Sequence, residues 1–171
     1  QVLLFHLYTQ LESCFDQCGN EKPYNFELNI ERFKPWVDKI TYYKIEDKAT
    51  RRFDFDWSNE QYVRNCLANA LDKFYKEKNI TPQDSDLILF GDCDEIVNNK
   101  ALKQAIGLSK NILSFTHLFN YCKLNYHAPA RKWFGGILVN FSTFLEYGSF
   151  QELRKVKDHI EHFEAKNNPS W

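Results

Sequence analysis

The chain has 171 residues, with 22 basic and 23 acidic side chains and a formal net charge of −1. A charge this close to neutral gives no electrostatic basis for binding nucleic acid or an anionic membrane surface. No apolar run approaches the roughly 20 residues of a membrane span, and the N-terminus lacks the basic segment of a signal peptide. A chain of this length is expected to form one domain, residues 1–171, whose core buries about 70% of the unfolded surface.

Residues 2–8 are largely apolar, which predicts a central strand of a sheet. In a doubly wound sheet, ligands bind where the strands end. Tyr8 and Thr9, at the end of this stretch, are therefore candidates to contact the base or ribose of a nucleotide. Packing of Tyr8 in the core is the alternative.

The segment 12–29 is polar and rich in turn-forming residues, with a short strand expected over residues 24–28. Residues 30–33 predict one helical turn that ends before Pro35. Alternating residues that favour β-structure predict a second strand of the sheet over residues 39–45.

The clearest helix is predicted over residues 59–77. Ser58 and Gln61 form the pattern of a capping box at its start. Its apolar residues share one stripe at helical spacing: Tyr62, Val63, Cys66, Leu67, Ala70, Leu71 and Phe74. Together with the strands at 39–45 and 86–91, this helix predicts a β-loop-α-β unit with a right-handed crossover.

Two polar residues of this helix are candidates for a nucleotide site. Arg64 lies beside the apolar stripe, and its planar guanidinium could bind a diphosphate. Asn65 points nearly opposite the stripe. The alternative for Arg64 is an ion pair with Glu60, one helical turn away, which stabilises a helix by only about 0.2–0.5 kcal/mol.

An acidic cluster follows the most apolar strand of the chain. Residues 87–90 are four apolar residues in a row, as in a strand buried on both faces of a sheet. Gly91 ends the run, and Asp92, Asp94 and Glu95 then place three carboxylates at the strand end. Mg²⁺ and Mn²⁺ prefer oxygen ligands and also bind phosphate, so the cluster predicts a metal–nucleotide site. A solvated acidic turn, with Glu95 near a helix start, is the alternative.

Short elements are expected after the acidic cluster. Asn98 is expected to cap a helix over residues 100–106, which Gly107 closes. Alternation of apolar and polar residues predicts two strands, over 112–119 and 120–127.

The last third of the chain mixes loops, one strand and a final helix. Residues 128–133 are expected to form a loop, followed by a strand over 137–141. Ser142 is expected to cap a short helical segment over 143–147. The spacing of apolar residues predicts a helix over 150–163.

A cluster of basic, aromatic and glycine residues precedes the strand predicted over residues 137–141. Gly135 and Gly136 allow the backbone to approach a ligand closely. Trp133 beside them offers a stacking face for a sugar, and Arg131 and Lys132 could neutralise phosphate. The alternative is a basic turn with Trp133 buried in the core.

The order and spacing of these motifs resemble those of a GT-A-fold glycosyltransferase. The resemblance is closest to family 17, the β-1,4-mannosyl-glycoprotein β-1,4-N-acetylglucosaminyltransferase type, and it covers most of the chain. After the apolar first strand, the matching pieces in chain order are Gly19-Asn20-Glu21-Lys22-Pro23, Arg32-Phe33, the helix residues Trp57, Glu60, Arg64 and Asn65, the run Asp92-Cys93-Asp94-Glu95-Ile96, and Trp133-Phe134-Gly135.

This resemblance implies an α/β fold with a GT-A-like, Rossmann-type mixed and mostly parallel sheet flanked by helices. It implies transfer of a GlcNAc-like sugar from a UDP-sugar to a glycan hydroxyl, with inversion and with Mn²⁺ or Mg²⁺ as cofactor. Asp92 and Asp94 are then the phosphate-bridging metal residues, with contact to the ribose, or to the metal through water, as the alternative for Asp92. Glu95 is then a supporting or acceptor-side carboxylate.

Several roles stay open. In the family the base that deprotonates the acceptor is a late carboxylate, and the candidates here are Glu146, Glu152, Asp158 and Glu161. His159 is a candidate third metal ligand, with a solvent-facing histidine as the alternative. Two other functions compete: a nucleotidyltransferase on a similar fold, and a catalytically degenerate glycan-binding domain.

The odd number of cysteines, five, slightly favours a reducing compartment. We therefore expect a soluble, cytoplasmic protein, with a Golgi-lumenal enzyme anchored by a segment outside this sequence as the alternative. Against the family pattern the chain looks clipped at both ends. The family's first nucleotide-binding segment would start before Gln1, and its Gly-Trp-His segment would begin around Trp171.

Overall fold

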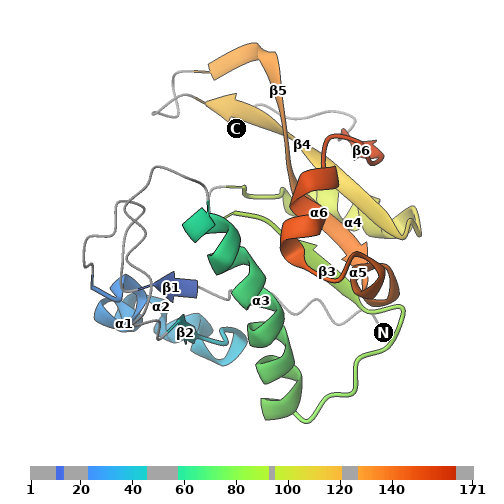
Figure 1. Cartoon of the computed structure of the whole chain (residues 1–171). Helices are drawn as coiled ribbons and strands as arrows, with labels where there is room; N and C mark the ends of the chain where they lie inside the picture. Colours follow the sequence, from blue (N-terminus) through green and yellow to red (C-terminus); the bar gives the residue numbers. More distant parts are fainter. Residues whose placement is uncertain (1–10, 14–22, 46–57, 93–94, 121–126, 165–171) are drawn as a thin grey trace. The chain divides into compact units, whose positions relative to one another are not determined.

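The structure is a computed structural model whose residues form two compact units (Figure 1). Among the described residues, the N-terminal unit comprises those from Leu11 to Pro82 together with residues 149–151, and the C-terminal unit comprises those from Gln83 to Gly148 and from Glu152 to Glu164. The structure describes residues 11–13, 23–45, 58–92, 95–120 and 127–164.

The N-terminal unit combines a small sheet with helices. Its elements are β1 (Leu11–Ser13), α1 (Asn25–Leu28), α2 (Ile30–Phe33), the 3₁₀ helix η1 (Lys34–Lys39), β2 (Tyr43–Ile45) and α3 (Ser58–Glu77). β1 and β2 pair in parallel, with Leu11 opposite Tyr43. The strand predicted over 39–45 is thus confirmed in its last three residues, and the strand predicted over 2–8 lies outside the described part of the chain.

The strand predicted over residues 24–28 is wrong, because this segment is the short helix α1. Phe26 alone is buried there, and its ring packs against the rings of Phe33 and Tyr42, with centroids 5.1 and 4.8 Å away. The Asn29 side chain donates a hydrogen bond back to the Asn25 carbonyl (2.8 Å). One buried anchor and a closed turn suit a helical turn better than the two-residue alternation of a strand.

α2 ends at Phe33, as predicted, but the chain remains helical through η1. Pro35 lies in the first turn of η1, where its missing N–H leaves no hydrogen bond unmade. The helix predicted over 59–77 is confirmed as α3. Cys66, Ala70, Leu71 and Phe74 of its apolar stripe are buried.

The C-terminal unit is built on a four-stranded sheet with the order β3-β5-β4-β6. Its elements are β3 (Leu87–Phe90), α4 (Asn99–Gly107), β4 (Ile112–Asn120), β5 (His127–Asn140), α5 (Phe141–Tyr147), α6 (Phe150–Val156, which begins in the N-terminal unit) and β6 (His162–Phe163). β5 runs antiparallel to both β3 and β4, and only β4 and β6 pair in parallel.

A mixed α/β fold with helices around the sheet is therefore confirmed, but the expectation of a mostly parallel sheet is not. Residues 121–126 alone join β4 to β5, and so short a connection can link only antiparallel neighbours. Among the described strands, β2 pairs with β1 and β3 pairs with β5, in separate sheets. The expected β-loop-α-β unit, in which β2 and β3 would belong to one sheet, is thus not found among the described strands.

α4 packs on one face of the sheet. Ala101, Leu102 and Ala105 of this helix bury their side chains against Leu113, Phe115 and Leu138 of the strands. As predicted, the Asn98 side chain caps α4 by accepting a hydrogen bond from the Lys100 N–H (2.8 Å). Side chains alternate between the two faces of a strand, so Ile137 and Val139, the neighbours of Leu138, lie on the face opposite α4, where both are fully buried.

Residues 128–133 belong to β5 and do not form the predicted loop. Trp133 lies opposite His117, and Gly135 lies opposite Phe115. The next pair joins Ile137 to Ser114, so Gly136 is an extra residue on β5. It forms a β-bulge with a left-handed backbone conformation (φ +60°), which glycine adopts without strain.

Two expectations near the C-terminus are corrected. The side chain of Asn140, not Ser142, caps α5 by accepting a hydrogen bond from the Thr143 N–H (2.9 Å). The final helix ends at Val156, and residues 162–163 form a strand instead of its last turn. The pairing of this strand with β4 lets Phe163 join the core beside Phe115, with ring centroids 5.7 Å apart.

Candidate active site at the end of β3

A tight turn leads the chain out of the buried end of β3. The Glu95 N–H donates to the Asp92 carbonyl (2.9 Å), and the Asp92 N–H donates to Glu95 Oε2 (3.1 Å). These reciprocal hydrogen bonds fold the Glu95 side chain back over the turn. The backbone of Asp92 is therefore fixed at the C-terminal end of the strand.

The Glu95 carboxylate is the centre of the site. Its Oε1 accepts a hydrogen bond from the Trp133 indole N–H (2.8 Å), and its Oε2 accepts one from the Gly136 N–H (3.0 Å). Arg154 Nη1 donates to Oε2 (2.8 Å), and Arg154 Nη2 lies 2.7 Å from Oε1. The side chain is only 4% exposed. A buried carboxylate is tolerated when it is paired and hydrogen-bonded in this way.

The pKa of Glu95 follows from these contacts. Burial by itself raises the pKa, but the hydrogen bond and charge of Arg154 outweigh it, helped by the Trp133 indole and the Asp92 N–H. The net effect lowers the pKa of Glu95 from 4.5 to about 2. The group stays ionised at neutral pH and is poorly matched to proton abstraction, which needs a pKa near the working pH.

Gly135 and Gly136 make room for Glu95 and its surroundings. A Cβ atom on Gly135 would overlap the Glu95 carboxylate, and one on Gly136 would lie 2.9 Å from Val97 Cγ2. The Gly135 carbonyl is also held, at 2.9 Å from His117 Nε2. The close approach at these glycines is to side chains of the protein itself, and their approach to a ligand stays a prediction.

Arg154 joins two of the acidic residues. Its Nη2 donates to Asp92 Oδ2 (2.8 Å) while the same guanidinium binds Glu95. The Arg154 side chain is 10% exposed, whereas that of Asp92 is 32% exposed. The guanidinium is therefore largely buried, and the Asp92 carboxylate faces solvent in part.

Lys157 lies against the Trp133 ring. Its Nζ is 3.9 Å from the ring centroid and donates to the Phe134 carbonyl (2.6 Å). The Arg154 guanidinium carbon is 5.8 Å from the same ring. Burial lowers the pKa of Lys157, and the Arg154 charge lowers it further, although Asp158, Glu95 and Asp92 oppose the shift. Two cations thus flank one indole ring beside the acidic turn.

The structure brings four of the predicted site residues together: Asp92, Glu95, Trp133 and Gly135. Other candidates of the C-terminal unit lie on its surface: Arg131 on β5, Glu146 on α5, and Asp158 and His159 after α6. Arg64 and Asn65 belong to α3 of the N-terminal unit, where Arg64 is half-buried and Asn65 is exposed. Tyr8, Thr9 and Asp94 lie outside the described residues.

Arg154 and Lys157 were not anticipated from the sequence. The available signal was their spacing on a predicted helix, because positions i and i+3 share one face. Two positive charges on one helix face can pair with the carboxylates at the end of the strand.

The charges of the turn fit a divalent cation. Residues 92–95 carry three carboxylates, and the single guanidinium of Arg154 neutralises one of them. Among the residues that the structure describes, no three His, Cys, Asp or Glu side chains converge. Asp92 is the described carboxylate here that could hold such an ion, and Asp94, which lies outside the described residues, stays a prediction from the sequence.

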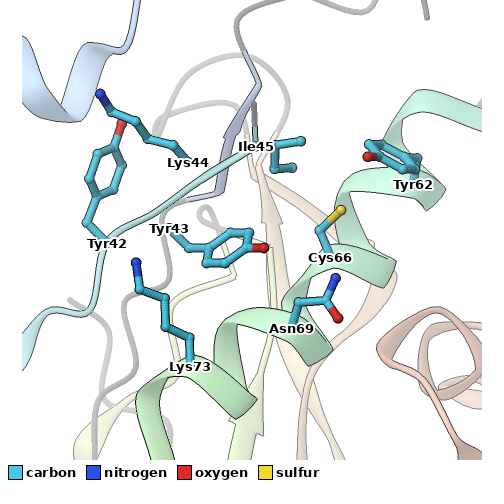
Figure 2. Close-up of a pocket in the computed structure, with 8 residues that line it drawn as sticks. All are labelled: Tyr42, Tyr43, Lys44, Ile45, Tyr62, Cys66, Asn69 and Lys73. Carbon is cyan, nitrogen blue, oxygen red and sulfur yellow. The ribbon is translucent and has the colours of Figure 1, made fainter. Parts of the chain in front are cut away.

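The N-terminal unit contains an open cavity of about 620 Å³ between β2 and α3 (Figure 2). Lys73 lies 5.6 Å from the centroid of the Tyr43 ring, and Lys44 pairs with Glu27. Aromatic faces beside amide and ammonium groups suit polar ring-shaped ligands. The cavity is lined by Tyr42, Tyr43, Lys44, Ile45, Tyr62, Cys66, Asn69 and Lys73.

The sequence model of a protein family described as Glycosyltransferase family 17 matches residues 4–153. A match over so much of the chain defines its class, that of the glycosyltransferases. The chain belongs to glycosyltransferase family 17. Searches among curated proteins and among solved structures returned no match.

The family implies a sugar donor and a glycan acceptor as partners. The longest described helix, α3, carries charged side chains along its length, and none of the described helices offers an apolar run that could span a bilayer.

Proposed function

We propose that this glycosyltransferase is metal-dependent and moves a GlcNAc-like sugar from a UDP-sugar to a glycan hydroxyl, with inversion at the anomeric carbon. The observation that carries the proposal is the Asp92 carboxylate at the end of β3, partly exposed and held by Arg154. An oriented, solvent-facing carboxylate at a strand end suits the binding of a metal–diphosphate group. The family match supports the sugar transfer itself.

The roles divide among the residues of the turn and its surroundings. Asp92 and Asp94 would hold Mn²⁺ or Mg²⁺, which as a Lewis acid offsets the negative charge that develops on the departing UDP. Glu95 orders the turn, since its two oxygens are occupied and its pKa is about 2. An exposed carboxylate such as Glu146 or Asp158 is left to remove the proton of the acceptor hydroxyl.

UDP-GlcNAc hydrolysis by the purified protein, with Mn²⁺ and with EDTA, tests the proposal. We expect release of UDP that requires Mn²⁺ and falls at least about 100-fold in Asp94→Ala and in Asp92→Asn, because removal of one electrostatic catalytic group typically costs that much. Asp72→Ala, an exposed residue of α3, is the matched control. A wild-type rate that Asp94→Ala leaves unchanged contradicts metal-dependent transfer.

A second measurement tests the nucleotide separately from the sugar. Melting temperatures are compared with UDP, GDP, CDP and ADP, each with and without Mn²⁺. Because a ligand stabilises the folded state in proportion to its binding free energy, UDP with Mn²⁺ is expected to give the largest rise. An equal rise with ADP would argue against a UDP-sugar donor.

A further inference from the structure

Arg154 is a buried cation to which the transfer chemistry described above gives no direct step. Its guanidinium binds Asp92 Oδ2 at 2.8 Å and Glu95 at 2.7–2.8 Å, and its side chain is only 10% exposed. Holding a long side chain in one buried conformation costs conformational entropy and desolvation. These costs mean that packing alone does not explain a buried arginine at this position.

The planar shape of the guanidinium supplies that reason. Its nitrogens form a rigid fork, so one side chain binds two carboxylates at once. The backbone of Asp92 is already fixed by the turn, and the hydrogen bond from Arg154 also constrains the rotation of the Asp92 side chain, which the backbone does not fix.

The neighbouring cation does not perform this task. Lys157 donates its hydrogen bond to the Phe134 carbonyl and lies over the Trp133 ring. Trp133 in turn donates to Glu95, so that the indole ring and Glu95 form the surroundings in which the Arg154 fork is held.

We infer that Arg154 is a positioning residue: it fixes the Asp92 carboxylate in the orientation in which that side chain receives the metal–UDP group. The inference rests on the proposed function, since it concerns the same site. A residue that orients a metal ligand typically changes metal affinity or activity about 10- to 100-fold when it is replaced.

The test is Mn²⁺ binding in the presence of UDP, measured from the free-Mn²⁺ signal in electron paramagnetic resonance and therefore independent of turnover. Arg154→Lys keeps the charge but not the fork, and we expect it to weaken Mn²⁺ binding by about 10- to 100-fold. The matched control is Lys155→Arg, the opposite exchange at the next position of α6, where Lys155 is exposed and pairs with Glu152. Its Mn²⁺ affinity should stay within about twofold of the wild type, because exposed ion pairs contribute little.

The Arg154→Lys exchange is repeated in a protein that carries Asp92→Asn, which distinguishes a positioning role of Arg154 from a merely structural one. If Arg154 acts through Asp92, Arg154→Lys should have little further effect on Mn²⁺ affinity there. An equal loss in both backgrounds, or no loss in the wild-type background, overturns the inference.

Should Arg154→Lys fail to fold, the double variant Glu95→Gln with Arg154→Met replaces the buried charge pair by neutral side chains. It should show the same loss of Mn²⁺ affinity, and full affinity would overturn the inference. A wild-type protein that binds no Mn²⁺ with UDP overturns the proposed function, and the role of Arg154 with it. Normal wild-type binding with an unaffected Arg154→Lys overturns the role of Arg154 alone.

Discussion

At the scale of single residues, Gly135 and Glu95 depend on each other. Glu95 reaches the Trp133 indole and the Gly136 N–H only because Gly135 has no side chain in the way. Any larger residue at position 135 must displace a carboxylate that four groups hold in place.

Gly135→Ala is therefore expected to destabilise the protein by about 1–3 kcal/mol, the usual cost of an extra methyl group in a tightly packed site. Urea denaturation measures the change. Gly107→Ala is the matched control, because a Cβ there meets nothing within 4 Å and the residue ends α4. That control should be neutral or slightly stabilising, and equal destabilisation by both exchanges would show that the overlap with Glu95 is not the cause.

Glu95 also makes the stability of the protein depend on pH. Its pKa is lower in the folded state, about 2, than the ordinary value of 4.5, so its contribution is complete above pH 4.5 and is lost as the pH falls toward 2. Between pH 7 and pH 3 we expect the wild type to lose about 2 kcal/mol more of its unfolding free energy than Glu95→Gln does. Urea denaturation of both proteins at the two pH values gives the comparison, and parallel losses would mean that the pKa of Glu95 is not depressed.

At the scale of elements, α4 has a predictable start. The Asn98 side chain accepts the Lys100 N–H, so Asn98→Ala should cost about 1 kcal/mol. Asn99→Ala, one position later and exposed, is expected to change stability by less than about 0.5 kcal/mol. Thermal and urea unfolding of the two variants would separate loss of the cap from any general effect of removing an asparagine.

The elements that the sequence predicted well are those in which a local pattern and the final packing agree. α3 has one apolar stripe, α4 has a cap at its start, and β3 is a short apolar run. In each case a short-range signal points to the same structure that the surrounding core requires.

The elements that the sequence mispredicted depend on distant partners. Residues 128–133 look like a basic loop but extend β5, because β4 supplies the pairing edge. Residues 162–163 carry on a helical pattern, yet pairing with β4 and the Phe115 ring holds them as a strand. Non-local pairing of this kind leaves no mark in a short window of sequence.

The site was predictable where its residues are adjacent in the chain and unpredictable where they are not. Asp92 and Glu95 were found from their position after β3, whereas Arg154 lies about sixty residues away and joins them only through the fold. The resemblance to the family indicated the function, whereas only the three-dimensional contacts identified Arg154 as part of the site.

At the scale of the whole molecule, folding and metal binding are expected to be separable. Arg154, Trp133 and two backbone N–H groups already satisfy Glu95, so the buried carboxylate that orders the turn is balanced from within the protein. We expect EDTA to abolish UDP-GlcNAc turnover while leaving the melting temperature of the ligand-free protein unchanged. A fall of several degrees on chelation would instead indicate a structural metal ion.

The β-bulge at Gly136 constrains the number of residues in β5. Because Gly136 is an extra residue, Trp133 and Gly135 share the face of Leu138 and not that of Ile137. Loss of a single residue between Trp133 and Leu138 would turn the indole away from Glu95 and carry the whole first half of β5 to the wrong side. We therefore expect relatives that keep this site to preserve the number of residues in the interval, and to gain or lose length in the connection between β4 and β5.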